Sequence, residues 1–525
     1  MATMKTPGVY IVEKNAFPNA VVEVATAVPA FIGYTEIADH QGTSLAHRPW
    51  RIGSLAEFHQ FFGGPPEARF EIRARAQSAA EPAAFALGDR AFDLARCDGT
   101  EHGRFILCRC MQLFFQNGGA SCYIVSVGDY TASAVDATAL IQGIEALVRA
   151  QEPTLVVVPD AVLLPEPDCI AVQQAALVHC GATMRNRFAI LDLWGGWRSR
   201  QDGADCVSDF RAHLGVDHLA FAAAYYPWVR TTVVQEGELG CTNISNPQQL
   251  QFLLRQEAGL DPGPASPTPE QAARLETIDD IGRTLDDGTV ADTRSADANQ
   301  RSNAQRTMAQ LNNALVATSP MFAALRSAMC RQLNLLPPSA AMAGVYTMVD
   351  TTRGVWKAPA NVGLAGVAAP SVALTSEDQQ DLNVTAEGKS INAIRAFIGE
   401  GVRVWGARTL DGNSLDWRYV NVRRSMLMIE ESCRLATRAM VFELNAPETW
   451  VTVESMLVNF LTGIWKRGGL AGATPDDAFS VHVGLGQTMT LDDVLEGILR
   501  VTVLVALSRP AEFIEISFQQ QMQKS

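Results

Sequence analysis

Acidic residues that follow buried strands are the first features of this sequence that could do chemistry. Asp160 follows the apolar run at residues 154–159. Asp192 lies near the end of a second such run, at residues 188–193. The carboxyl ends of strands are where open α/β sheets bind ligands, so both are candidates for catalysis. An aspartate at a strand end caps the next turn or helix more often than it catalyses, and capping is the alternative interpretation.

Other patterns that could bind a phosphate or a metal are incomplete. Residues 383–390, NVTAEGKS, nearly match a phosphate-binding loop, but Asn383 replaces the first glycine and no apolar strand precedes it. Such a loop needs a strand before it and a helix after it. His213 and His218 are five residues apart and fall on different helix faces, and the ten cysteines contain no CxxC spacing. We therefore expect buried thiols, and no catalytic, cofactor-binding or metal-binding residues and no cofactor.

Length and charge limit the classes of partner. The chain has 525 residues, enough for about two to four domains. Its 42 basic and 56 acidic residues give a net charge of −14, which argues against nucleic acid or an anionic membrane as a partner. Only 19% of residues are charged and 47% are hydrophobic, yet no segment has the apolar length of a membrane span or of a signal peptide. We expect no membrane insertion, and a surface that something else partly covers.

The middle of the chain, residues 27–255, predicts an open α/β domain. Nearly continuous apolar runs alternate with amphipathic segments, as in consecutive βαβ units with a mostly parallel sheet. The expected strands are at residues 121–128, 154–159, 188–193 and 219–228, and the expected helices at residues 105–119, 134–150, 170–184 and 206–214.

The later sequence predicts an insertion and a further domain. Residues 256–305 are polar and have neither helical nor strand periodicity, which indicates a surface insertion or linker. Residues 306–505 form the expected second domain. In it, residues 417–443 read as a long helix on which Glu430 pairs with Arg434, and residues 447–465 as a second helix that ends at glycines.

Both chain ends contain an alternating apolar segment without a hairpin partner. Residues 1–26 are interpreted as an N-terminal arm and residues 506–525 as a C-terminal arm. Unpaired apolar strands favour aggregation unless another strand covers them. They either complete the chain's own sheet or pair with neighbouring copies. The residues proposed for strand exchange between subunits are Val9, Tyr10, Ile11, Val12, Phe513, Ile514, Ile516 and Phe518.

Several short motifs in fixed order resemble the contractile tail sheath proteins. Those near the N-terminus are TPGVYIVE and AVPAFIGYTE. The distal half contains TRGVWKAPAN, INAIR, RVWGARTL, WRYVNVRR, IEES, TMTLDDV and RPAEFIEISF. The resemblance covers about two thirds of the chain. It departs at Ile398, Glu400, Leu507 and Ser508, where related chains tend to have other residues.

The resemblance implies a structural subunit rather than an enzyme. Copies would stack as hexameric rings around an inner tube, with baseplate and terminal cap proteins at the ends, and contraction would drive the tube through a target envelope. The implied fold is α/β: a conserved α+β sheath domain built from the C-terminal part plus the N-terminal arm, a middle α/β domain and a polar insertion. The N-terminal segment favours a phage-tail-like injection particle over a phage virion tail. Either would be assembled in the bacterial cytoplasm. The alternative function is an α/β enzyme that acts on a small substrate at the strand ends.

The resemblance also suggests where the tube is held. Residues 391–467 carry a small excess of basic residues within an acidic chain, which suits an inner surface facing an acidic tube. Lys466 and Arg467 end a helix and have no acidic residue within one turn along the sequence, so they are the candidate tube contact. Pairing of charges along solvated helices is the alternative interpretation for the basic residues of this stretch.

Overall fold

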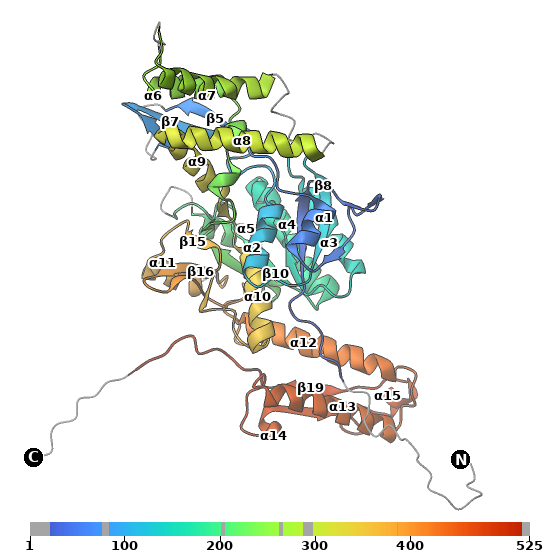
Figure 1. Cartoon of the computed structure of the whole chain (residues 1–525). Coiled ribbons are helices and arrows are strands. Elements are labelled where there is room, and N and C mark those ends of the chain that lie inside the picture. Colours follow the sequence, from blue (N-terminus) through green and yellow to red (C-terminus); the bar gives the residue numbers. More distant parts are fainter. Residues whose placement is uncertain are drawn as a thin grey trace, which may run out of the picture. The chain divides into compact units, whose positions relative to one another are not determined.

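The computed structural model describes residues 21–75, 83–200, 205–261, 266–286, 298–385 and 387–516. These residues form two compact units. Figure 1 shows the whole chain. Unit 1 contains the described residues of Met1–Thr26, Asp350–Ala358 and Asn421–Ser525, and unit 2 those of Ala27–Val349 and Pro359–Val420. The expected domain at residues 306–505 is thus shared between the units, because its first strands join the sheet of the middle region.

A mixed nine-stranded sheet forms the centre of unit 2 and confirms the predicted α/β class. Neighbouring strands from β8 to β16 are parallel, and only the edge strands β4, β17 and β14 run antiparallel to their neighbours. The four predicted strands are present and adjoin β1 or one another. In spatial order the strands are β14 (Val362–Gly363), β17 (Gly401–Trp405), β16 (Asn392–Phe397), β11 (Ala222–Tyr226), β10 (Phe188–Asp192), β9 (Leu155–Val157), β1 (Pro29–Thr35), β8 (Cys122–Asp129) and β4 (Trp50–Ile52).

Helices cover both faces of this sheet. Successive side chains of a strand point to opposite faces. In β1, Phe31 contacts Phe114 of α2, whereas Ile32 lies against Gly143 of α3, so α2 and α3 are on opposite faces. A Cβ atom on Gly344 of α10 would lie 2.6 Å from the carbonyl oxygen of Phe114, so glycine there allows α10 to pack closely on α2. The helices packed around this sheet are α2 (Leu107–Gln116), α3 (Ala137–Ala146), α4 (Glu166–Val178), α5 (Cys206–His213) and α10 (Ser339–Arg353).

Unit 2 contains a second core, and part of residues 256–305, which the sequence predicted as a polar surface insertion or linker without helical periodicity, is helical. Helix α7 (Pro269–Asp286) occupies much of this stretch, and α8 (Ala298–Thr318) begins within it. Ile278 and Ile281 of α7 are buried in a core shared with a three-stranded sheet. The sequence did not predict this helix because only a few of its apolar residues pack against the core, so its hydrophobic periodicity is weak. The other elements around this core are β5 (Phe70–Ala74), β6 (Phe85–Leu87), β7 (Arg90–Arg96), α6 (Pro247–Glu257) and α9 (Pro320–Leu333).

The remaining elements of unit 2 are short. They are β2 (Asp39–His40), β3 (Thr43–Ser44), α1 (Leu55–Phe62), β12 (Val229–Thr231), β13 (Leu335–Leu336), β15 (Val367–Pro370) and α11 (Ser376–Asn383). Among the described residues of both units, no helix has the length and hydropathy needed to cross a bilayer.

Unit 1 packs two long helices and a two-stranded sheet around its own core. Helix α13 (Pro447–Lys466) buries an apolar face at helical spacing, as predicted for residues 447–465. Helix α12 (Val420–Thr437) is shorter than predicted, because a 3-10 turn follows it and Phe442 adopts a left-handed conformation at φ 74°. The other elements are α14 (Pro475–Ala478), β18 (Phe479–His482), α15 (Leu491–Leu495) and β19 (Thr502–Val505), shown with α12 and α13 in Figure 1.

Candidate assembly surfaces

Asp160, at the strand end of β9, caps a helix. One carboxylate oxygen accepts the backbone N–H groups of Ile106 and Leu107, at 2.9 and 3.1 Å, where α2 begins. The other accepts the N–H of Tyr34 at 2.8 Å. A Cβ atom on Gly33 would lie 2.6 Å from that oxygen, so glycine leaves room for the carboxylate. Burial raises the pKa of Asp160 to about 6, although the three donors favour the charged form.

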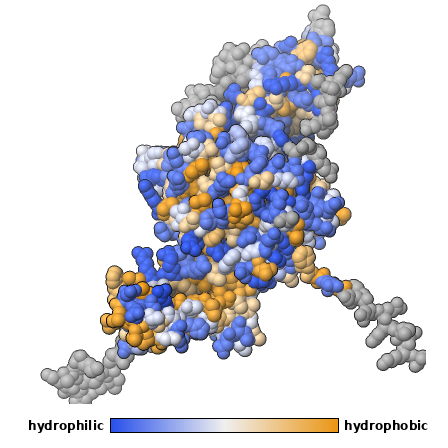
Figure 2. Space-filling view, turned by 180° about the vertical axis from the view of Figure 1, so that it is seen from behind, coloured by the Kyte–Doolittle hydropathy of each residue, from blue (hydrophilic) through white to orange (hydrophobic). Residues whose placement is uncertain are grey.

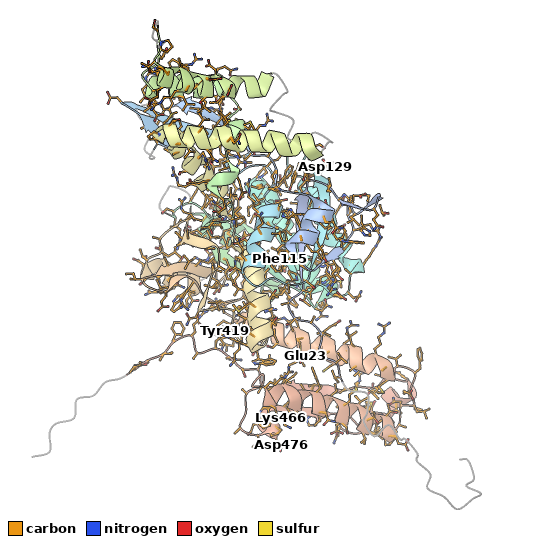
Figure 3. All side chains as sticks on the ribbon, viewed as in Figure 1. Glu23, Phe115, Asp129, Tyr419, Lys466 and Asp476 are labelled. Carbon is orange, nitrogen blue, oxygen red and sulfur yellow. The ribbon has the colours of Figure 1, made fainter. Side chains whose placement is uncertain are left out.

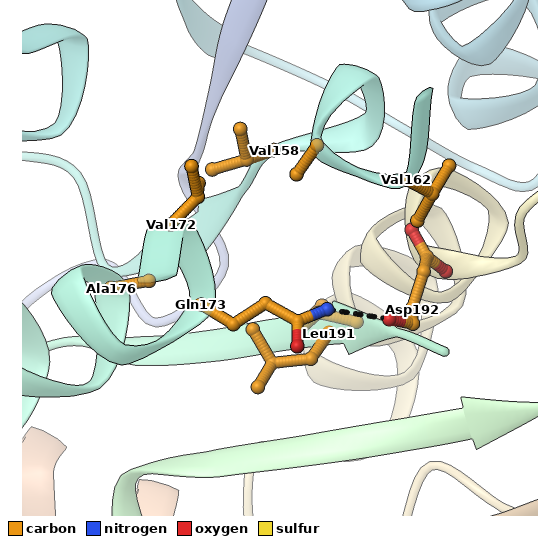
Figure 4. Close-up of a pocket in the computed structure, with 9 residues that line it drawn as sticks. Val158, Val162, Val172, Gln173, Ala176, Leu191 and Asp192 are labelled. Atoms are coloured by element: carbon orange, nitrogen blue, oxygen red, sulfur yellow. Dashed lines mark hydrogen bonds between the residues drawn. The ribbon is translucent and has the colours of Figure 1, made fainter. Parts of the chain in front are cut away.

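Asp192 caps α10 in the same way. It accepts the N–H of Ser339 at 2.8 Å and the Ser339 hydroxyl, and burial raises its pKa to about 7. The pocket beside it is lined by β10 and α4, and Gln173 donates to the Asp192 carbonyl at 2.6 Å (Figure 4). This pocket leaves room for about one water molecule. The geometry of both aspartates therefore matches the capping interpretation.

The Asp192 carboxyl predicts a pH dependence of stability. Because its folded-state pKa lies above that of an unfolded aspartate, the folded protein takes up the proton first as pH falls. The wild type should gain stability from about pH 7 toward pH 4, by at most ~1.4 kcal/mol per pH unit from this group. Asp192→Asn keeps a hydrogen-bonding side chain that does not titrate, so the variant should lose this gain. Urea unfolding from pH 5 to 8 measures it, and parallel pH curves for the two proteins would contradict the assignment.

The segment that resembles a phosphate-binding loop is used structurally. It follows α11 rather than a strand. Lys389 is buried and donates to the carbonyl oxygen of Arg211, whose guanidinium donates back to the Lys389 carbonyl at 3.1 Å. Within the described ranges, no three His, Cys, Asp or Glu side chains gather in a way that could hold a metal. All ten cysteines are free; seven are buried as expected, whereas Cys97 is exposed.

Exposed apolar side chains are concentrated in unit 1. Of the 22 large hydrophobic side chains that are exposed among the described residues, 13 belong to this unit, although it holds about a quarter of the chain. Figure 2 shows hydrophobic residues gathered on its surface. They are Val22, Leu435, Val441, Phe442, Leu444, Val451, Leu485, Leu491, Leu495, Leu504, Phe513, Ile514 and Ile516. A surface of this kind is typical of a protein that functions in contact with a partner.

The C-terminal arm is among these exposed segments. Leu507 still bridges to Leu470, but residues 509–516 are in neither a helix nor a strand. Phe513 and Ile514 are 74% and 80% exposed, and Ile516 is also exposed. Four of the residues proposed for strand exchange, Val9, Tyr10, Ile11 and Val12, and also Phe518, lie outside the described residues. Phe513, Ile514 and Ile516 are thus exposed, and their pairing with a neighbouring subunit stays a prediction.

The sheet of unit 1 is open at both sides. β18 and β19 pair antiparallel, with Phe479 opposite Val505 and Val481 opposite Val503. Within the part of the chain that the structure describes, neither strand has a second neighbour. One face of the pair contributes to the core formed with α13. The two outer edges therefore present backbone N–H and C=O groups that further strands can pair with.

A buried ion pair fixes the point where the N-terminal arm joins unit 1. Arg424 on α12 donates to both carboxylate oxygens of Asp350, at 3.0 and 2.6 Å, and their side chains are 3% and 4% exposed. The Thr26 hydroxyl donates to Asp350 at 2.6 Å, and Arg424 donates to the Thr26 carbonyl at 2.9 Å. Val24 donates to the Ser432 hydroxyl at 3.1 Å. These contacts hold residues 24–26 on α12.

The two candidate tube-contact residues differ in their surroundings. Lys466, labelled in Figure 3, is exposed at the end of α13. Arg467 is paired with Glu23 at 2.5 Å, and its guanidinium lies over the Trp356 ring at 5.0 Å. The sequence suggested an unpaired cation because Glu23 is 444 residues away along the chain. Lys466 is therefore the more accessible of the two. On α12, Arg434 pairs with Glu431, whereas the sequence predicted Glu430 as its partner.

We expect the Glu23–Arg467 pair to orient the N-terminal arm. Arg467→Glu places two carboxylates together and should weaken assembly slightly, since an exposed pair contributes about 0.2–1 kcal/mol. The charge swap Glu23→Arg/Arg467→Glu should restore it. The critical concentration for polymerisation, measured by sedimentation, separates the variants. Equal critical concentrations for all three proteins would show that this pair does not contribute to assembly.

Comparison with known proteins gives matches to sheath proteins. Residues 413–521 match the family described as phage tail sheath C-terminal domain. The chain is 33% identical over 139 residues to the tail sheath protein of Burkholderia phage BcepMu; the match covers 26% of this chain and 28% of that protein. The chain thus spans about a quarter of the length of this curated relative.

Solved structures match over nearly the whole chain. The helical sheath of the anti-feeding prophage (AFP) in its contracted state is 27% identical, with 99% of this chain and 100% of that chain covered and a TM-score of 0.57. The PVC sheath complex of an extracellular contractile injection system, also contracted, is 25% identical, with 99% of each chain covered and a TM-score of 0.57. The similarity is therefore not limited to one of the two units.

Proposed function

We propose that this chain is a contractile tail sheath protein, and that its copies polymerise as stacked hexameric rings around an inner tube by exchange of their terminal arms. The observation that carries the proposal is the match between two open edges of β18–β19 and two apolar arms. One edge would receive the arm of one neighbour, and the other edge the arm of another. Main-chain hydrogen bonds would supply affinity, and the alternating apolar side chains would fix the register.

Contraction would release free energy stored at assembly. No nucleotide is needed if the extended polymer is metastable and the contracted packing is lower in free energy. A difference of a few kcal/mol per subunit adds up over every ring. The anchored root at Thr26 and Arg424 supports this role, since an arm must transmit force without pulling out of its own subunit.

An injection particle is the proposed setting, released or held at the cell surface after assembly in the bacterial cytoplasm. The AFP and PVC structures match over the full chain, whereas the phage relative matches over a quarter of its length. Baseplate and terminal cap proteins would bind the ends of the sheath. A virion tail remains the second setting for the same sheath role.

The inner tube is the proposed partner of Lys466. Its ammonium group is exposed at the end of α13. Contacts with an acidic tube have to release during contraction, and exposed ion pairs are weak enough to do so. Arg467 would support this contact less directly, because it already pairs with Glu23.

Electron microscopy of the concentrated, purified chain tests the proposal. We expect rings or tubes. A protein that stays monomeric at every concentration and turns over a small substrate would instead support an α/β enzyme.

A further inference from the structure

Seven arginines are buried among the described residues, and Arg109 on α2 differs from the rest. Its guanidinium makes no hydrogen bond and no ion pair with the described part of the chain, although only 5% of the residue is exposed. A charge that leaves water without an acceptor or a counter-charge is costly, so Arg109 needs a partner. The other six each have one, and they are Arg187, Arg211, Arg326, Arg408, Arg423 and Arg424.

The positive charge of Arg109 is not balanced within the chain. Burial lowers its pKa to about 10, and the charge of Arg96 acts in the same direction, so the group is still cationic at neutral pH. The Asp98 carboxylate favours the cation, but Nε and Nη2 of Arg96 already donate to it. Two other carboxylates near this end of α2 are also engaged: Asp160 accepts three backbone N–H groups, and Glu36 accepts one at 2.7 Å.

Two neighbouring arginines also have buried donors without an acceptor among the described residues. The Nη1 group of Arg96 is one of them, on the side of the guanidinium that does not bind Asp98. The Nε group of Arg104 is the other, while its Nη1 group donates to the Ala132 carbonyl oxygen at 3.2 Å. Buried N–H groups without an acceptor are rare, and a bound water or ion is a common explanation for them.

The connection between β7 and α2 brings these arginines to one end of α2. Gly103 has φ 94°, and a Cβ atom there would lie 2.6 Å from Nη2 of Arg96, so the connection passes directly over that guanidinium. Phe105 ends the connection, and Arg109 lies one helical turn beyond it. Because helical side chains lean toward the N-terminus of their helix, the Arg109 side chain covers this turn.

We propose that Arg96, Arg104 and Arg109, which we call the arginine cluster, bind one phosphate-class oxyanion. Guanidinium groups bind phosphate oxygens with paired, charge-assisted hydrogen bonds. The donors come from the end of β7, from the connection and from α2. The oxygens of a tetrahedral oxyanion also point in different directions, whereas the two oxygens of a carboxylate share a plane.

The nature of the cluster limits what can bind. A water molecule would accept from these donors but would not balance the charge. The small exposed fraction of Arg109 suits a free ion and not a nucleic acid strand. The bound ion would tie β7 to α2 within unit 2, so this inference does not depend on the proposed polymerisation.

Equilibrium dialysis of the full chain against ³²P-labelled inorganic phosphate, at constant ionic strength, measures binding. We expect a single phosphate per chain. Arg109→Met should lower the affinity about tenfold or more, and Arg109→Lys, which keeps the charge but not the bidentate geometry, should lower it less. The control Arg90→Met removes an exposed arginine at the other end of β7 and should leave the affinity unchanged.

Hydrogen exchange adds a second readout. Phosphate at about ten times its Kd should slow exchange in wild-type peptides from residues 97–116 about tenfold, because opening of this region releases the ion. Arg109→Met should not respond to phosphate. Without phosphate, this variant should exchange no faster than the wild type, because the substitution removes a buried charge that has no partner. Arg104→Gln leaves Arg109 in place and should weaken binding about threefold.

Three results would overturn the proposal. The first is a wild type that binds no phosphate, or binding that Arg109→Met and Arg104→Gln both leave unchanged. The second is equal protection by acetate in a parallel series, which would replace the oxyanion with a carboxylate. The third is faster exchange of Arg109→Met than of the wild type in phosphate-free buffer, since Arg109 would then have a structural partner in the chain.

Discussion

A chain that lacks residues 1–14, or one that lacks the residues from Glu512 onward, should fold and fail to form tubes. The cores of both units lie outside these segments, which supply only contacts between subunits in the proposed sheath. Each truncation leaves one edge of β18–β19 uncovered, so a helical polymer cannot propagate. Circular dichroism should be near that of the wild type, while sedimentation should show the loss of large species.

The matched control shortens the polar end of the chain. Removing residues 521–525 leaves Phe513, Ile514, Ile516 and Phe518 intact and should preserve assembly. Truncated chains that polymerise at the same critical concentration as the wild type would show that the arms do not link the subunits.

Arg424→Met should lower the free energy of unfolding of unit 1 by about 3–5 kcal/mol, because it leaves the buried Asp350 carboxylate without its cation. The Thr26 carbonyl also loses a donor, so the root of the N-terminal arm should loosen. Hydrogen exchange of peptides from α12 and α13 measures both effects in the full chain.

Two further variants make this prediction specific. Arg434→Met removes the exposed pair with Glu431 and should cost at most about 1 kcal/mol. Arg424→Met/Asp350→Leu removes both buried charges and should recover part of the loss. Equal destabilisation by Arg424→Met and Arg434→Met would contradict the role given to the buried pair.

The sequence predicted the strands and helices whose burial produces a hydrophobic pattern in consecutive residues. The strands at β9, β10 and β11 are buried on both faces, so each is a continuous apolar run that is visible in the sequence. The buried face of α13 was also visible in the sequence, because its apolar residues recur at helical spacing. Helix α7 has only a few apolar positions because it covers a small core, and its periodicity is correspondingly weak.

Contacts between distant residues had no local signal. Arg424 and Asp350 are 74 residues apart, and Arg467 and Glu23 are 444 residues apart. The position of β1 between β8 and β9 likewise depends on pairing across more than 90 residues. The apolar alternation of the two terminal segments was visible in the sequence, whereas the open edges of β18–β19 were visible only in the fold.

The most direct test of strand exchange is a cryo-electron microscopy map of tubes formed by the full chain. The account predicts a four-stranded sheet in every subunit, in which β18 and β19 are flanked by residues 9–12 of one neighbour and residues 513–518 of another. Tubes in which this sheet keeps two strands, or in which both added strands come from the same chain, would contradict it.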